Sequence, residues 1–324
     1  MKKKMIAGLA LGGLLVWLSL RGIEFQGLID GFRTIRRGYI LPALAVLLLM
    51  QILRSIRWGI ILRPIAKVDQ LSLFSVTSVG FLAITAFPAR LGELARPYLI
   101  TKKSPIPMSS ALGTVFVERV LDSLTVLIIA VIALFFTPLP TWLIRSSTLL
   151  LLATVILSAI MILMIVRRET TLRALSPLIA RIPERYAGRL HRLIDHFIAG
   201  FRIMVDPILL FWATFLSIVI WLIDVLAIYL LFLAFNLELS VTAAVVLMIV
   251  LIIGIAIPTG PGFIGNWHYF CVLGLGLFGI PKTDALTFAI VYHAISIGLI
   301  ILLGLLFLPF NRFRFSDLRH QTES

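Results

Sequence analysis

Long apolar stretches separated by short polar segments dominate the chain. Such stretches cover residues 5–20, 40–62, 110–136 and 208–235, and two more end at residues 166 and 308. A helix needs about 20 apolar residues to cross the hydrocarbon core of a bilayer. The pattern therefore predicts about six transmembrane helices. The first follows Lys2, Lys3 and Lys4 without a small-residue cleavage site, so we expect an uncleaved anchor rather than a signal peptide.

Two further apolar runs, residues 71–101 and 241–280, are interrupted by proline and glycine. In the first run the interruption begins at Pro88, and a helix arriving from Leu71 should stop near Phe87, because proline lacks a backbone donor and clashes with the preceding turn. Broken backbone at membrane depth must lie against protein or a water-filled cavity. We therefore expect two re-entrant helical hairpins. A cytoplasmic loop in the first run, and a simple packing kink in the second, are the alternatives.

Composition and charge place the whole chain in the membrane as a single domain, residues 1–324. Hydrophobic residues make up 60% of the sequence and the mean hydropathy is +1.08, well above the range of soluble proteins. The single cysteine, Cys271, excludes an internal disulfide framework, and the histidines lack metal-ligand spacing, so we predict no metal and no cofactor. The longest polar segment, about residues 167–206, is a basic amphipathic linker too small for a typical catalytic domain.

The lysines and arginines between the apolar stretches set the orientation. With a cytoplasmic N-terminus, most of them fall in the predicted cytoplasmic segments, including Lys102, Lys103 and the linker. The basic loop between Arg21 and Arg37 fits this arrangement poorly. We expect both termini inside a bacterial or archaeal cytoplasmic membrane.

The two halves of the chain repeat each other with an offset of 173 residues, which separates Pro88 from Pro261 and Gly92 from Gly265. The same offset places residues 40–62 on the fifth apolar stretch and residues 110–136 on the sixth. The half-repeats cover about residues 40–136 and 208–309, and they enter from opposite sides by the charge count. Such an inverted repeat is the plan of many secondary transporters, whose sites lie where broken helices meet.

Charged residues cluster where the first half should be buried in the membrane. A charge in mid-span costs about 2.5–3.5 kcal/mol on insertion scales, so these groups must have partners. Either they form a structural ion-pair lattice, or some of the arginines bind a lipid phosphate through two donors. The candidate head-group residues are Arg90, Glu93, Arg96, Glu118, Arg119 and Asp122, with Arg54 and Arg57 in support.

The second interruption supplies free backbone amides and the positive end of a restarting helix, which suit an anionic group. Its candidate residues are Pro261, Gly262, Gly265 and Asn266, which face the first interruption across the repeat axis. Asp224 and His293 are isolated polar residues in later spans. They predict either a proton relay or a hydrogen-bonded structural pair.

These motifs resemble a known family. Arg90-x-Gly92-Glu93-x-x-Arg96, then Glu118-Arg119-x-x-Asp122, then Pro258-x-x-Pro261-Gly262-x-x-Gly265, are similar to the flippase-like membrane region of lysylphosphatidylglycerol synthases. The resemblance covers about residues 40–308 and implies a lipid-handling domain with paired re-entrant segments. The sequence ends at Ser324 without the soluble aminoacyl-transferase domain, so we expect no synthase activity and no enzyme.

Three function classes follow. The first is a lipid transporter or flippase that moves an anionic lipid, either a phospholipid or a polyprenyl-phosphate carrier, between leaflets. The second is a membrane-embedded transferase with Glu118, Asp122 or Glu93 as base, and the third is an accessory subunit of a lipid or cell-envelope biosynthesis complex. The repeat favours the first, because alternating access is readily built from two related halves. We expect anionic membrane lipids as partners and no nucleic acid, and self-association into a homo-oligomer stays open.

Overall fold

The computed structural model describes residues 2–23, 25–87, 92–136, 141–171, 183–257 and 259–311, and every element assigned within these ranges is a helix, as predicted. The α-helices are α1 Lys2–Leu20, α2 Phe25–Arg33, α3 Ile40–Leu62, α4 Gln70–Ala86, α5 Ala95–Ile100, α6 Met108–Leu134, α7 Thr141–Val166, α9 Glu184–Ala199, α10 Pro207–Ala234, α11 Val241–Ala256, α12 Asn266–Gly276 and α13 Lys282–Phe307. Short 3₁₀ turns are η1 Arg37–Tyr39, η3 Arg202–Val205, η4 Pro261–Phe263 and η5 Pro309–Asn311.

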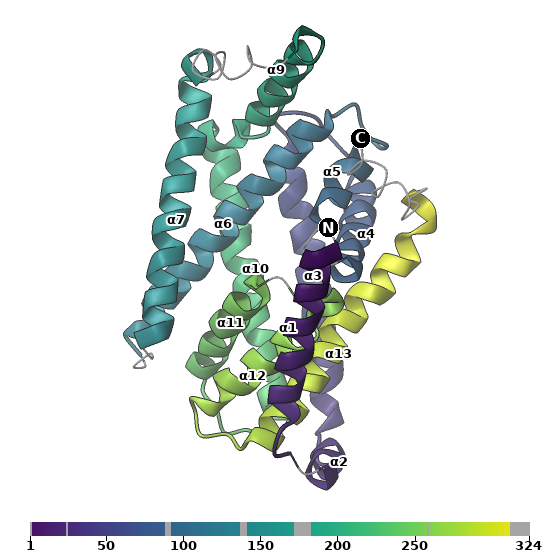
Figure 1. Cartoon of the computed structure of the whole chain (residues 1–324), viewed down its shortest axis with the longest axis vertical. Helices are drawn as coiled ribbons and strands as arrows, with labels where there is room; N and C mark the ends of the chain where they lie inside the picture. The colour runs from purple at the N-terminus through teal and green to yellow at the C-terminus, as the bar shows by residue number, and fades with distance from the viewer. Residues whose placement is uncertain are drawn as a thin grey trace.

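The long helices run roughly along the long axis of the molecule, with α7 on one flank and α13 on the other (Figure 1). Among the described helices, η1 with α3, and α7, α10 and α13, are long and apolar enough to cross a membrane. Helix α6 has 27 residues but carries Glu118, Arg119 and Asp122 around its middle. The chain is thus a multi-pass membrane protein, while the count of six crossings stays a prediction.

Each interrupted run forms a helix, a break and a second helix that folds back on the first. Helix α4 ends at Ala86, where Phe87 turns extended with φ −99° and ψ 134°, as the proline at 88 predicts. Helix α5 then returns so closely that a Cβ on Gly80 would lie 2.1 Å from Cγ of Arg96. The second hairpin repeats this contact, since a Cβ on Gly254 of α11 would lie 2.4 Å from the ring of Phe270 in α12.

Equivalent helices of the two halves run in opposite directions. The start of α3 meets the end of α10, where the Arg36 amide donates to the Ala234 carbonyl at 2.8 Å, and Ile61 at the far end of α3 shares a core with Ala213 at the start of α10. Helix α6 begins beside α9, whereas α13 begins at the opposite end of the molecule (Figure 1). The halves are therefore packed head to tail, with α3 and α10 at their interface.

The second break lies against the first hairpin in the middle of the molecule. Turn η4 of the second break packs against α4 of the first hairpin. Helix α1 crosses the second break from outside, because a Cβ on Gly265 would lie 2.3 Å from the Gly12 carbonyl oxygen. The predicted anchor is thus part of the packed structure, and the region between the breaks is enclosed by both halves.

The predicted amphipathic linker contains α9, followed by η3. Ile198 is buried, and Phe201 is buried in a core with Val117 and Leu121 of α6. A Cβ on Gly200 would lie 2.4 Å from the Ser110 carbonyl oxygen. Leu193 stays 48% exposed, so the helix has one free apolar position near its middle. Residues 172–182 of the linker lie outside the described residues.

Candidate functional site

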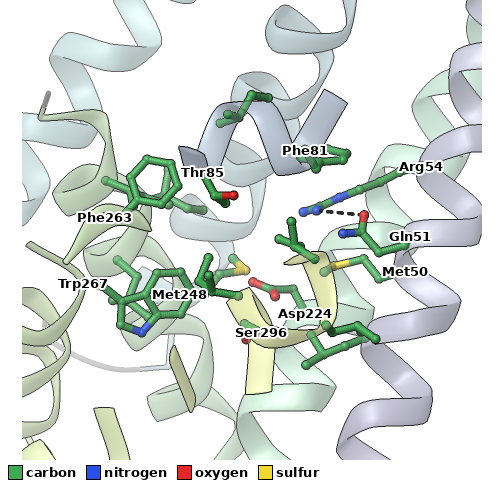
Figure 2. Close-up of a pocket in the computed structure, with 18 of the residues that line it drawn as sticks. Met50, Gln51, Arg54, Phe81, Thr85, Asp224, Met248, Phe263, Trp267 and Ser296 are labelled. Atoms are coloured by element: carbon green, nitrogen blue, oxygen red, sulfur yellow. Dashed lines mark hydrogen bonds between the residues drawn. The ribbon is translucent and has the colours of Figure 1, made fainter. Parts of the chain in front are cut away.

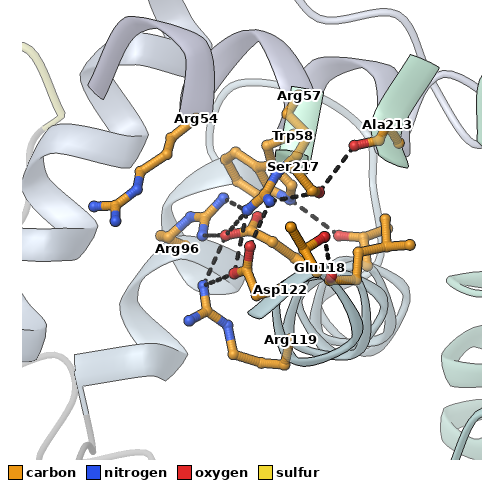
Figure 3. Close-up of polar contacts among 12 residues, drawn as sticks. Arg54, Arg57, Trp58, Arg96, Glu118, Arg119, Asp122, Ala213 and Ser217 are labelled. Carbon is orange, nitrogen blue, oxygen red and sulfur yellow. Dashed lines mark hydrogen bonds and ion pairs between the residues drawn. The ribbon is translucent and has the colours of Figure 1, made fainter. Parts of the chain in front are cut away.

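Helix α6 is the centre of a buried charge lattice, defined here as Arg57, Arg96, Glu118, Arg119 and Asp122 (Figure 3). Residues 118 and 122 are one turn apart and share a helix face. Arg57 reaches them from α3 and Arg96 from α5. The lattice therefore ties three helices of the first half together.

Arg96 is held by a two-donor ion pair with Glu118. Its Nη1 and Nη2 atoms donate to Oε1 and Oε2 at 2.9 Å each, the fork geometry that only arginine provides. The guanidinium also lies 4.2 Å from the ring centroid of Trp58, close enough for a cation–π contact. Arg96 is 1% exposed, so its charge interacts with groups of the protein and not with the cavity.

Asp122 and Arg57 extend the lattice to α10. Arg57 Nη1 donates to Asp122 Oδ1 and, at 2.8 Å, to the Ser217 hydroxyl, while its Nη2 lies 3.3 Å from Glu118 Oε1. The Trp221 indole N–H donates to Asp122 Oδ1 at 3.1 Å. Both carboxylates of α6 thus accept from several donors, which is what keeps ionised groups stable when buried.

A cavity of about 190 Å³ lies beside the lattice, between the two hairpins and the α3–α10 pair (Figure 2). Most of its lining is apolar, and α11 contributes only apolar side chains. Polar and aromatic lining residues come from every other long element around it: Gln51, Arg54, Phe81, Thr85, Glu93, Arg119, Trp221, Asp224, Phe263, Trp267, Tyr292 and Ser296.

Charges enter the cavity from both halves. Arg54 from α3 and Asp224 from α10 both extend into this space (Figure 2). Arg119 lies on the third side, where its side chain is 41% exposed while its Nη2 atom donates to Glu118 at 2.8 Å. Glu93 lines the same cavity, and its charge attracts that of Arg119. The cavity is an apolar pocket with a few convergent ionic groups, the usual form of a ligand site.

The second break is held by side-chain hydrogen bonds rather than by ion pairs. The Asn266 amide donates to the carbonyls of Gly254 and Ile257 at 3.1 and 3.2 Å, and its oxygen accepts from Thr259 at 2.8 Å. Nε2 of His293 lies 2.7 Å from the Gly262 carbonyl oxygen. Gly262 and Gly265 have φ of +66° and +98°, a region in which side chains are strained.

The sequence candidates separate into three groups. Glu93, Arg119, Arg54 and Asp224 line the cavity. Arg57, Arg96, Glu118 and Asp122 form the lattice behind it, whereas Pro261, Gly262, Gly265, Asn266 and His293 build the second break. Arg90, like Pro258, lies outside the described residues.

Two pairings differ from simple expectation. Asp224 lines the cavity together with Tyr292, while the neighbouring His293 contacts Gly262 in the second break, so the two predicted relay residues lie in different parts of the site. Ser217 and Trp221, which complete the lattice, were missed in the sequence. They share a helix face with Asp224 at intervals of three and four residues, and that spacing was the available signal.

Comparison with known proteins identifies the family. Residues 5–304 match the lysylphosphatidylglycerol synthase TM region. The chain belongs to this family. A UPF0104 membrane protein of Methanothermobacter thermautotrophicus is 25% identical over 298 residues, covering 87% of this chain and 88% of the relative. No solved structure matches the chain.

Two UPF0104 membrane proteins of Methanocaldococcus jannaschii are also similar. One is 29% identical over 223 residues, covering 67% of this chain and 88% of the relative. The other is 24% identical over 288 residues and covers 82% of each chain. The family match includes α1 and extends to α13, so it spans both hairpins and the cavity between them.

Proposed function

We propose that this member of the family binds the phosphate-bearing head group of an anionic membrane lipid in the central cavity and moves the lipid between leaflets. The observation that carries the proposal is the position of Arg54 and Arg119, which present guanidinium groups to a cavity enclosed by the breaks of two oppositely directed halves. Arginine suits phosphate recognition because its planar fork matches phosphate geometry.

The packing of the halves supports transport over simple binding. Equivalent helices run in opposite directions about the α3–α10 interface, and the cavity lies on that interface. In transporters of this plan, one half rocks against the other around a central site. The apolar remainder of the lining suits the part of a lipid next to its head group.

A transferase using Glu118 or Asp122 as base is less well supported. Both carboxylates accept hydrogen bonds from lattice arginines and lie behind the cavity wall. A general base must be free to reach the proton that it removes. We expect the purified protein alone to transfer no aminoacyl or glycosyl group to lipid, and a new modified lipid after incubation with charged tRNA or sugar nucleotides would overturn this expectation.

Lipid binding by arginine variants tests the proposal. Arg119→Gln and Arg54→Gln should each weaken binding of a short-chain phosphatidylglycerol about tenfold to a hundredfold, because a hydrogen bond to a charged group contributes about 1.5–3 kcal/mol. Arg119→Lys keeps the charge but loses the fork, so it should bind with intermediate affinity. Unchanged binding and unchanged leaflet exchange in reconstituted vesicles for both Gln variants would place the site elsewhere.

We also propose that the end carrying α9, Lys102 and Lys103 is cytoplasmic. Lys103 donates to the carbonyl of Phe310 in η5, which follows α13. Lys282, at the start of α13 and the opposite end of the molecule, donates to the Leu18 and Arg21 carbonyls (Figure 1). Cysteines placed at positions 103 and 282, on a Cys271→Ser background, should label from opposite faces of the membrane. Labelling of both from one face would exclude this topology.

A further inference from the structure

Asp224 is the one carboxylate that α10 contributes to the lining of the cavity. Arg54 of α3 extends into the same space (Figure 2), and the opposite charges of the two residues attract each other. Tyr292 of α13 also lines this cavity. Nη1 of Arg54 also donates to Oε1 of Gln51 at 3.5 Å. This hydrogen bond is long, so the guanidinium can still bind a ligand.

The lattice carboxylates are held differently. Glu118 accepts from both nitrogens of the Arg96 fork and from Arg119, and Asp122 accepts from Arg57 and Trp221. Arg57 and Arg96 do not line the cavity, so these two cations stay with Glu118 and Asp122 when a ligand arrives. Arg54, the cation facing Asp224, lies inside the cavity, where a ligand can take it.

An anionic head group that binds Arg54 therefore competes with Asp224. If Asp224 stayed ionised, the cavity would hold a second anion without its cation, and an uncompensated charge is strongly unfavourable in such surroundings. Uptake of a proton from water forms an O–H bond on the Asp224 carboxylate and removes that charge. The bound lipid and the proton together then leave the net charge of the cavity unchanged.

We propose that Asp224 takes up a proton when an anionic head group binds Arg54, and releases it when the lipid leaves, so that lipid and proton are coupled. The inference rests on the proposed function, because it needs an anionic lipid in the cavity. In this scheme Asp224 is the group that takes up the proton. Arg54 is the cation for which the lipid head group and the Asp224 carboxylate compete. The lipid monoanion and its proton cross the cavity as a neutral pair.

Other charged and titratable groups face Asp224 within the described part of the chain. Arg54 is on α3, Arg119 is on α6, Tyr292 is on α13, and Glu93 lies in the first break; the α11 side chains that line the cavity are apolar. Glu93 is the competing proton acceptor, and it interacts with Arg119. The repeat equivalent of Asp224 is Gln51, which cannot take a proton, so the proton site has no counterpart in the first half.

Calorimetry on the full-length protein in detergent tests the coupling. Dihexanoylphosphatidylglycerol is titrated at neutral pH in buffers of different ionisation enthalpy, and the slope gives the protons taken up. We expect about one proton per lipid for the parent and for Glu93→Gln, and about none for Asp224→Asn, which should still bind. Absence of saturable binding by the parent counts against the proposed function. Binding without proton uptake, or uptake that Asp224→Asn retains or Glu93→Gln abolishes, overturns the inference alone.

Infrared difference spectra provide a second measurement that does not require the Asp224→Asn variant to fold. Lipid addition to the parent should produce the carbonyl band of a protonated carboxylic acid. In Tyr292→Phe, which keeps the carboxylate but removes a hydroxyl from the lining of the same cavity, that band should move to higher frequency. No band in the parent, or a band that is unchanged in Tyr292→Phe, contradicts the assignment to Asp224.

Discussion

The two halves of the molecule build the same helix arrangement around different centres. At equivalent positions the first half has ionic side chains and the second has neutral ones: Arg54 and Ala227, Arg57 and Leu230, Glu93 and Asn266, Arg96 and Tyr269, Glu118 and Val291, Arg119 and Tyr292, Asp122 and Ile295. Helices α11 and α12 nevertheless fold back on one another as α4 and α5 do. A charge lattice is therefore not needed to form a hairpin of this kind.

This difference between the halves indicates what the buried charges of the first half do. Burial of an ion pair gives little net stability compared with apolar packing of similar volume, and the second half shows that apolar packing suffices here. The lattice instead fixes α6 so that Arg119 faces the cavity while its neighbours Glu118 and Asp122 stay paired behind it. The cavity thus has a cationic wall from one half and a largely neutral wall from the other.

The largest effect is expected at the centre of the lattice. Glu118→Gln leaves Arg57 and Arg96 without a full counter-charge, and breaking a buried pair in this way costs about 3–5 kcal/mol. The equivalent change in the second half, Val291→Ala, should cost about 1 kcal/mol because it removes only apolar contact. Thermal unfolding in detergent compares the two. Equal losses of stability for the two variants would show that the ion pairs of the first half contribute no more than the apolar contacts of the second.

The next effect concerns the breaks. Gly92 and Gly265 are repeat equivalents, and an added Cβ would lie 2.2 Å from the Ala83 carbonyl carbon in one and 2.3 Å from the Gly12 carbonyl oxygen in the other. Gly265 also has φ of +98°, so Gly265→Ala adds left-handed strain to the collision and should lose about 2–4 kcal/mol. Gly92→Ala should lose about 1–3 kcal/mol. A larger loss for Gly92→Ala would mean that α1 yields easily over the second break.

Much of the fold could be predicted from the sequence because its causes are local. Apolar runs of membrane length, and the helix stop imposed by Pro88, depend on neighbouring residues only, and α4 does end at Ala86. The clustering of Glu118, Arg119 and Asp122 on one helix also required partners, and Arg57 and Arg96 supply them.

The assignment of individual arginines could not be predicted in the same way. Arg96 was expected at the head group, yet it is enclosed by Glu118 and Trp58 because α5 folds back over Gly80, where its side chain fills the space that a Cβ would take. These contacts join residues from four helices, α3, α4, α5 and α6. The cavity likewise depends on how α3, α10 and the breaks meet, and the sequence carries no local signal for it beyond the spacing of Ser217, Trp221 and Asp224.

A smaller loss of stability is expected in the second break, which has no ionic side chain at the position of Glu93. Asn266 occupies the position equivalent to Glu93 and donates to two backbone carbonyls. Asn266→Ala should cost about 1–3 kcal/mol, since it leaves buried carbonyls unpaired. Thr259→Ala removes a single bond from the same group and should cost about 1 kcal/mol. Thermal unfolding of both variants tests the order, and the reverse order would show that the amide of Asn266 does not hold the break.

The smallest loss of stability is expected at Arg119, where the lattice meets the cavity. Its side chain is 41% exposed, compared with 1% for Arg57, so Arg119→Gln should cost about 1 kcal/mol or less, in the range of exposed ion pairs. Arg57→Gln should cost about 3–5 kcal/mol, because it leaves Asp122 and Glu118 buried with too few donors. Thermal unfolding in detergent tests whether Arg57→Gln loses more stability than Arg119→Gln.

Lipid binding should reverse that order between the same two variants. Arg119→Gln removes a guanidinium from the cavity and should weaken phosphatidylglycerol binding, whereas Arg57→Gln, measured at a temperature where it stays folded, should bind nearly as the parent does. A purely structural lattice gives a different result, because loss of binding would then follow loss of stability in both variants. The opposite orders of stability and binding are therefore the signature of one cationic cluster with a buried part that holds the helices and an exposed part that meets the lipid.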